Sequence, residues 1–180
     1  AEKDLSILSQ IEVTDYQHID VIGKGDKNKK GFIAQQIEKV FPEAVSKSID
    51  FIPNIYEMAF SVKKDPINHT IIIYLNKEHQ LVTGDIVKLI TDKMYEESVT
   101  VIDDKTFSIN ATINDIDRIF VYGKSVNDFR AVDYDRIFTL NVSATQALLK
   151  RIEALEKENA HLKQDKAKTE ASVQNLIERV

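Results

Sequence analysis

The sequence predicts an α+β protein: a small globular α/β head, an inserted β-rich module of barrel or sandwich type, and a long C-terminal helix in a parallel coiled-coil bundle. Apolar residues near the start recur at helical spacing, β-branched runs separated by turn residues fill the middle, and residues 133–180 contain neither glycine nor proline. The expected divisions are a head at residues 1–56, a β-rich module at 57–131 and a helix at 132–180.

The head is predicted to begin with a short apolar helix followed by a strand. Leu5, Leu8 and Ile11 are spaced for one helical face, and the β-leaning residues 13–19 come next. Residues 23–31 combine glycines with charged side chains, which predicts a solvated hairpin loop.

A second helix is predicted within residues 33–44. Four apolar residues from Ile33 to Ala44 recur on one helical face, and Pro42 should end the helix or force a tight final turn. Residues 50–56 then predict an extended connector, because a proline restricts the residue before it to extended conformations.

The middle of the chain favours short strands. Turn residues at 76–79, 83–85 and 103–105 separate the β-branched runs. Short strands at this spacing favour a closed or packed β structure, and the sequence leaves barrel and sandwich both open. The predicted strands are residues 70–75, 86–90, 99–102, 106–109 and 116–122.

The C-terminal segment is predicted to be one long helix with Asp133 as its N-cap. A helix of this length extends roughly 70 Å at 1.5 Å per residue, which is more than one small domain covers. The helix therefore needs a partner.

A heptad repeat in this helix indicates that the partner is another copy of the same helix, in a coiled coil. Residues spaced alternately by four and three define a coiled-coil seam that is apolar at both ends and polar in the middle. Its a positions are Ile152, Asn159, Lys166, Val173 and Val180. The d positions are Leu148, Leu155, Leu162, Thr169 and Leu176. The predicted oligomerisation residues are Leu148, Ile152, Leu155, Asn159, Leu162, Val173, Leu176 and Val180.

The number of helices in this coiled coil stays open at this point. A β-branched a position with leucine at d and one asparagine at a favours two strands. In a parallel arrangement the pairs Arg151–Glu156 and Glu158–Lys163 attract, whereas Asp165–Glu170 repels. A single helix folded back on its own domain is the alternative to self-association.

Composition excludes several classes of function. The net charge of -5 and the absence of cysteine argue against nucleic acid as the main partner and against a thiolate metal site. No apolar run approaches the roughly 20 residues of a membrane helix, so a soluble protein without a membrane partner is expected. The four histidines form no metal-binding pattern, and neither metal nor cofactor is expected.

The glycine motif at residues 123–125 does not predict a nucleotide-binding site. Gly123-Lys124-Ser125 follows a predicted strand as a phosphate-binding loop would, but Arg118 stands where that loop needs glycine. This motif is interpreted as a strand end that leads into a connector.

The run from Gly31 to Val45, GFIAQQIEKVFPEAV, resembles the signature of the endosialidase-type intramolecular chaperone family. Residues 5–19 and 132–148 are similar to the helix-strand start of that family and to its C-terminal helix. The resemblance covers roughly residues 1–56 and 132–155, and the β-rich module between them is an insertion. The family-signature residues are Gly31, Phe32, Ile33, Ala34, Gln35, Pro42 and Glu43.

The resemblance implies a homotrimer that templates the folding of a preceding viral fibre or spike domain in the host cytoplasm during virion assembly. The chaperone is then released from the mature virion protein by autoproteolysis. In this family a serine at a Ser-Asp junction attacks the preceding peptide bond with help from a lysine, which is nucleophilic catalysis by an activated hydroxyl.

The sequence departs from the family pattern at two points. It contains no Ser-Asp dipeptide, so no catalytic residue is assigned in this chain, Lys3 included, and the serine and lysine are expected upstream of Ala1. Gln36 stands where the family usually has glutamate. The competing hypotheses are a non-catalytic coiled-coil adaptor, for which a dimer is the runner-up state, and the equivalent domain of a membrane-bound transcription factor.

Overall fold

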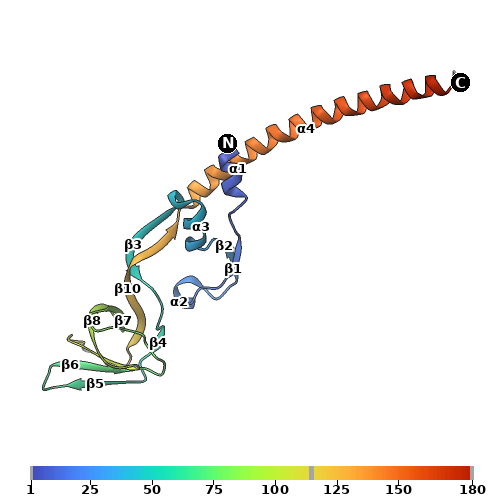
Figure 1. The fold of residues 1–180 in the computed structure, drawn as a ribbon. Helices are drawn as coiled ribbons and strands as arrows, with labels where there is room; N and C mark the ends of the chain where they lie inside the picture. Colours follow the sequence, from blue (N-terminus) through green and yellow to red (C-terminus); the bar gives the residue numbers. More distant parts are fainter. Residues whose placement is uncertain (1, 114–115, 179–180) are drawn as a thin grey trace. The chain divides into compact units, whose positions relative to one another are not determined.

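The computed structural model describes residues 2–113 and 116–178, which fall into two compact units (Figure 1). The helical unit combines residues 1–12, 35–44 and 132–180, and the strand unit combines residues 13–34 and 45–131. Three separate segments of the chain therefore meet in the helical unit.

The helical unit contains α1 (Glu2–Leu8), α3 (Ala34–Val40), the 3-10 turn η1 (Pro42–Ala44) and α4 (Tyr134–Ile177). Both α1 and η1 pack against the first turns of α4. The predicted short helix at the start and the break at Pro42 are confirmed, since proline cannot continue the hydrogen-bond ladder of a helix. The buried apolar side chains of this unit are Ile37, Ala44, Ile137, Leu140, Ala144 and Ala147.

Helix α4 is the longest element and begins at the predicted cap. The Asp133 carboxylate accepts hydrogen bonds from the backbone N–H groups of Asp135 and Arg136, which satisfies two free donors of the first turn. The Asp133 N–H donates to the Ala44 carbonyl at 2.8 Å, so η1 is tied to the start of the helix. The 44 residues of α4 correspond to about 66 Å.

The strand unit opens with a hairpin in which β1 (Thr14–Tyr16) pairs antiparallel with β2 (Lys29–Gly31). The hairpin loop expected at residues 23–31 is shorter than predicted, because the short helix α2 (Val21–Lys24) overlaps its start and β2 forms its end. The cause is a local cap: the Asp20 carboxylate accepts from the Gly23 N–H at 2.8 Å.

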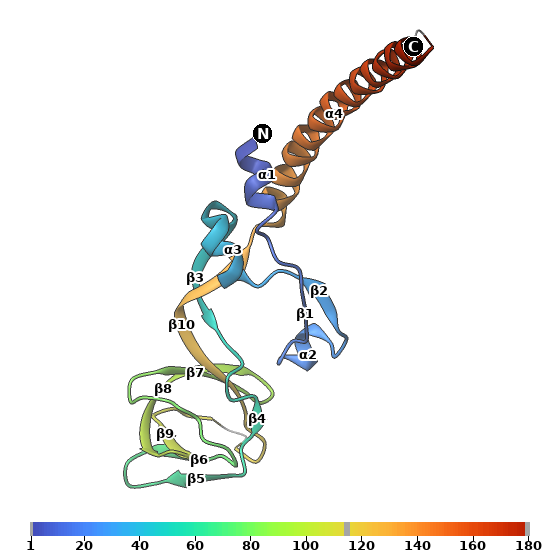
Figure 2. The ribbon, with the colours of Figure 1, turned by 45° about the vertical axis from the view of Figure 1, so that its right-hand side comes forward.

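The main sheet has eight strands in the order β3-β10-β7-β8-β9-β6-β5, with β4 also paired to β10. In Figure 2, strands β4 to β9 gather at one end of β10, and β3 runs beside its other end. The pairs whose register is resolved are antiparallel. The strands are β3 (Val45–Phe51), β4 (Glu57–Met58), β5 (Ser61–Asp65), β6 (Thr70–Tyr74), β7 (Ile86–Ile90), β8 (Met94–Asp103), β9 (Thr106–Ile109) and β10 (Phe120–Val132).

One apolar core lies within this sheet. In β6, buried and half-buried residues alternate, as the two-residue period of a strand requires. Phe107, Ile73, Leu89, Val87 and Val121 are fully buried, and strands β6, β7, β9 and β10 contribute them. The predicted strands at 86–90 and 106–109 are confirmed residue for residue.

Other strand predictions were wrong, because two strands were not predicted and two others have different boundaries. Strands β3 and β5 were not expected because most of their side chains are polar and exposed, so strand pairing stabilises them more than burial does. Strand β8 begins at Met94, well before the expected start at residue 99. Strand β10 covers 120–132, whereas a strand at 116–122 and a connector after it were expected.

Gly123 explains the last of these errors. It lies inside β10 at a register shift, with φ of +154°, and is not a strand end. A Cβ atom there would collide with the Ile52 carbonyl oxygen and lie 2.6 Å from Oδ1 of Asn54. Asn54 Oδ1 also accepts from the Lys124 N–H at 2.9 Å, so the glycine permits a close approach between β10 and the segment after β3.

Candidate self-association helix and family segment

The second half of α4 is uncovered. None of residues 148–178 is buried, whereas the first turns of the helix pack on α1. The predicted seam residues Leu148, Ile152, Leu155, Leu162, Val173 and Leu176 are between 44% and 64% exposed. Asn159 is exposed as well, and the remaining predicted seam residue, Val180, lies outside the described residues.

The exposed seam is an amphipathic face that no other part of residues 2–113 and 116–178 covers. Helical stability in proteins comes mainly from packing such a face, so an uncovered helix of this length needs a covering surface. Covering the exposed half of a leucine or isoleucine side chain contributes roughly 1–2 kcal/mol. The arrangement is suited to association with another amphipathic helix.

Ion pairs within the helix modify the charge pattern beside the seam. Asp165 pairs with His161 at 3.0 Å and with Lys168 at 3.6 Å, and Glu170 lies 3.7 Å from Lys166. Both acids of the repelling pair Asp165–Glu170 therefore have a cationic side chain on their own helix. This weakens the repulsion that a parallel arrangement was expected to suffer.

The family-signature residues occupy two stretches of the chain, one from the end of β2 to the start of α3 and the other in η1. Gly31 is buried at the end of β2, opposite Thr14, and Phe32 and Ile33 are half-buried. Ala34 is the first residue of α3, Gln35 is exposed on that helix, and Pro42 and Glu43 are exposed in η1. Ile37 and Ala44 are both fully buried.

Gln36, the departure from the family pattern, has a local explanation. Its side-chain Nε2 donates to Oε2 of Glu12 at 3.2 Å. A carboxylate at position 36 would instead face a second carboxylate, so the neutral amide is the better partner for Glu12 in this chain.

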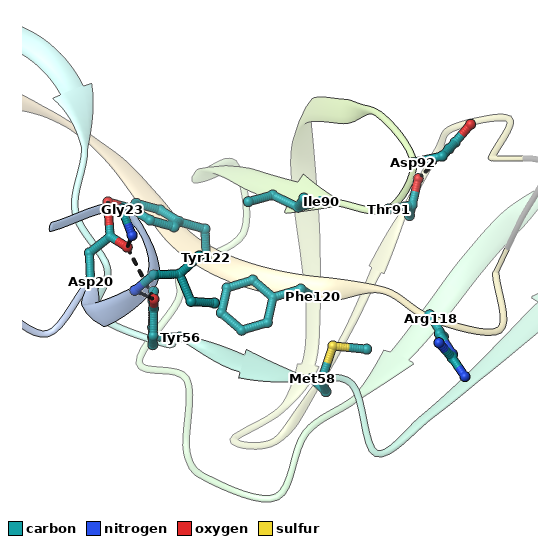
Figure 3. A pocket seen from close by; sticks show the side chains of 11 residues that line it. Asp20, Gly23, Tyr56, Met58, Ile90, Thr91, Asp92, Arg118, Phe120 and Tyr122 are labelled. Atoms are coloured by element: carbon teal, nitrogen blue, oxygen red, sulfur yellow. Dashed lines mark hydrogen bonds between the residues drawn. The ribbon is translucent and has the colours of Figure 1, made fainter. Parts of the chain in front are cut away.

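A polar cluster ties α2 to the main sheet within the strand unit. The Tyr56 hydroxyl donates to Oδ1 of Asp20 at 3.0 Å and accepts from the Ile22 N–H at 3.0 Å (Figure 3). The Tyr122 hydroxyl donates to Oδ2 of Asp20 at 3.3 Å. No sequence pattern indicates this cluster, because Asp20 and Tyr122 are 102 residues apart.

The cluster shifts the acidity of its members. The Gly23 N–H, followed by the two tyrosine hydroxyls, holds the pKa of Asp20 below its ordinary value, so this carboxylate is ionised near neutral pH. Burial, followed by the neighbouring Asp20 charge, raises the pKa of the Tyr122 hydroxyl. The Tyr122 hydroxyl therefore remains a protonated donor to Asp20.

A pocket of about 610 Å³ lies beside this cluster. Figure 3 shows Met58, Ile90, Phe120 and the two tyrosines along it, with Thr91, Asp92 and Arg118 toward one end. The Tyr56 ring meets Phe120 edge to face at 5.0 Å. The mainly apolar lining is suited to an apolar group.

Residues 2–113 and 116–178 contain neither a metal-binding cluster nor a helix suited to a membrane. No group of three or more histidine, aspartate or glutamate side chains in this part of the chain is arranged to hold a metal ion. Within the same residues, no helix combines the length and the apolar character that crossing a membrane requires.

The N-terminal segment of the chain matches a known protein family. Residues 1–46 match the family model described as chaperone of endosialidase. The chain is also similar to uncharacterized protein VP1 of Micromonas pusilla reovirus (isolate Netherlands/2005), with 26% identity over 198 residues. That match covers 83% of this chain but only 10% of the relative, so the chain spans about a tenth of the viral protein it matches.

These matches support a chaperone-type role and fit a viral protein. The family match includes all seven predicted signature residues and ends just after η1. The resemblance inferred from the sequence is therefore confirmed for residues 1–46, the part of this chain that matches the chaperone-of-endosialidase family.

Proposed function

We propose that this chain is an intramolecular chaperone domain that assembles as a homotrimer through α4 and templates the folding of a preceding viral fibre or spike domain. The observation that carries the proposal is the uncovered seam of α4 from Leu148 to Leu176. The family match at residues 1–46 gives this self-association its chaperone context.

The physical argument is that three parallel helices bury one another's seams. Burying leucine, isoleucine and valine side chains in this way offsets the entropy lost on association. A parallel assembly also brings three copies of the helical unit to the same end of the bundle. Chains that precede these copies would be held close together, which raises their effective concentration for folding as a trimer.

Self-association is tested by measuring the mass of the chain in solution with light scattering. We expect a trimer, and a double change of Leu155→Glu and Leu162→Glu should reduce it to a monomer. The matched control is Lys157→Glu with Gln164→Glu, which changes two exposed positions on the opposite side of the same turns. A monomeric unmodified chain would contradict the proposal, and a stable dimer would favour the adaptor hypothesis.

Release by autoproteolysis is a separate part of the proposal. In the longer polypeptide that it requires, a serine upstream of this domain attacks the peptide bond before it, and the chaperone leaves. The test is to express that longer polypeptide and follow spontaneous cleavage by gel electrophoresis and mass spectrometry. Cleavage should stop when the serine at the cut is replaced by alanine, and a polypeptide that stays intact would contradict this part.

A further inference from the structure

The pocket of the strand unit lies on the face of the main sheet that the apolar core does not use. Strand register sets three of its side chains in one row, since Phe120 on β10 lies opposite both Met58 on β4 and Ile90 on β7. The residues adjacent to this row, Val121 and Leu89, point to the other face and are fully buried in the core. The row therefore supplies apolar side chains to the pocket rather than to the core.

Aromatic rings extend this row into a pocket of small-molecule size. The Tyr56 ring meets the Phe120 ring at 5.0 Å and the Tyr122 ring at 5.9 Å, each time edge to face. Ile22 is 84% exposed and Met58 is 46% exposed, so apolar surface is left open at the pocket. The volume of about 610 Å³ falls in the range of roughly 300–1,000 Å³ that small-molecule sites occupy. The pocket is therefore suited to a compact apolar body such as a ring.

The Asp20 end of the pocket disfavours an anion. The Asp20 carboxylate already accepts hydrogen bonds from the Gly23 N–H and from the Tyr56 and Tyr122 hydroxyls. These bonds, the Gly23 N–H first, hold the pKa of Asp20 below its ordinary value, so its charge is negative near neutral pH. A negatively charged ligand group is therefore repelled from this end.

The opposite end of the pocket favours an anion. Arg118 is the single cation among the described residues that line the pocket, and it lies at the end away from Asp20 (Figure 3). No hydrogen bond or ion pair joins its guanidinium to another side chain of residues 2–113 and 116–178. Asp92 at the same end is instead bonded to its neighbour, since the Thr91 hydroxyl donates to its Oδ1 at 2.7 Å. The planar guanidinium of Arg118 is therefore available to a planar carboxylate, which it can bind through two N–H groups.

We infer that this pocket binds a small carboxylic acid with a ring-sized apolar body, whose carboxylate pairs with Arg118 and whose body lies along Met58, Phe120 and Ile90. The site goes beyond the proposed chaperone function and does not depend on self-association. Most of its lining lies beyond residue 46, where the family match ends.

Three probes with the same phenylpropyl body separate charge from apolar contact: phenylpropionate, phenylpropanol and phenylpropylamine. The chain has two methionines, of which Met58 lines the pocket and Met94 does not, so isotope-labelled methionine methyl groups report binding by NMR. We expect a saturable shift of the Met58 resonance that exceeds the shift of Met94. Phenylpropionate should bind roughly two- to fivefold more tightly than phenylpropanol, as an exposed ion pair allows, and phenylpropylamine should bind most weakly.

Two results would overturn the inference in this titration. One is a Met94 shift as large as that of Met58, and the other is tightest binding of the amine. Acetate carries the charge without the body and should leave the Met58 resonance in place at the same concentrations. Acetate that acts as strongly as phenylpropionate would show that the apolar row does not bind the ligand.

Arg118→Gln tests the charged end of the pocket. The neutral amide should reduce the affinity for phenylpropionate to that for phenylpropanol, whose own affinity should not change. The matched control is Lys105→Gln, which removes an exposed cation at the turn between β8 and β9, outside the pocket, and should keep the two- to fivefold preference. A preference that survives in Arg118→Gln would overturn the assignment of the carboxylate to this residue.

The two proposals fail in different ways. A chain that is trimeric by light scattering but shows no saturable Met58 shift rejects the ligand site and leaves the proposed function standing. A monomeric chain that binds phenylpropionate as expected rejects self-association and leaves the ligand site standing.

Discussion

The Ser143 hydroxyl donates a 2.6 Å hydrogen bond to Oδ2 of Asp4, which joins α4 to α1 across 139 residues of sequence. This bond is the principal reason that the pKa of Asp4 lies below its ordinary value. It connects the folding of the helical unit to pH, since the bond is strongest when the carboxylate is ionised.

The first prediction concerns acid stability. Because the pKa of Asp4 is lower in the folded state, its stabilisation is present above the unfolded pKa of about 3.9 and is lost as the pH falls through the folded pKa. Ser143→Ala should lower the melting temperature at pH 7, and its difference from the unmodified chain should shrink toward pH 2. Ser172→Ala, which removes a hydroxyl bonded within α4 to the Lys168 carbonyl, is the control. A difference that stays constant with pH would contradict the assignment.

A second prediction concerns the close approach at Gly123. Gly123→Ala should destabilise the strand unit by at least roughly 3 kcal/mol, because the added methyl group meets backbone atoms that cannot move aside. Gly84→Ala has a positive φ of +100° but open space around its Cβ position, so it should cost only about 1–2 kcal/mol. Urea unfolding followed by circular dichroism measures both, and equal costs would show that crowding at Gly123 is unimportant.

Tyr56 provides a third prediction, on the attachment of α2. Tyr56→Phe removes the hydroxyl that bridges Asp20 and the Ile22 N–H, and should cost about 1–3 kcal/mol because one partner is charged. Proteolysis within residues 20–28 should accelerate in the same variant. Tyr74→Phe is the control, since it keeps the ring that Lys63 approaches at 5.3 Å. Unchanged stability and unchanged proteolysis in Tyr56→Phe would show that the bridge does not hold α2.

Buried His79 leads to a fourth prediction. Its Nδ1 accepts from the Leu81 N–H at 2.9 Å, so the proton of the neutral ring lies on Nε2, which has no hydrogen-bond partner among the described residues. His79→Ala should cost about 2–4 kcal/mol through the lost bond and the cavity beside Phe107. His161→Ala on exposed α4 should leave the unfolding of the strand unit unchanged. Comparable losses in the two variants would contradict this assignment.

The fifth prediction follows from the proposed seam. Asn159→Val replaces the polar a residue by a β-branched one and should raise the melting temperature of the assembly, because a buried asparagine specifies register at a cost in stability. The same variant should give a broader distribution of masses in light scattering. A lower melting temperature would indicate that Asn159 faces solvent in the assembly.

Local patterns predicted the elements whose structure depends on local physics. The Asp133 cap, the break at Pro42 and the strands at 86–90 and 106–109 follow from capping, ring geometry and β-branched runs, which neighbouring residues decide. Strand β3 escaped prediction because its exposed polar residues are held by pairing with β10, which lies some 70 residues away in the chain.

The candidate sites likewise divide into features that neighbouring residues determine and features that depend on distant residues. The seam from Leu148 onward is visible as a period in the sequence, whereas the row of Met58, Phe120 and Ile90 becomes recognisable only once the strand register is known. The Asp20–Tyr56–Tyr122 cluster depends wholly on tertiary approach. No local spacing could have indicated it.

The order of the described segments along the chain bears on the timing of the proposed self-association, because α4 follows the strands. A ribosome adding roughly 5–20 residues per second completes α1, the β-rich module and β10 before the seam emerges. The proposed contact through the seam would therefore follow the synthesis of the described strands of each copy, which gives those strands time to fold first.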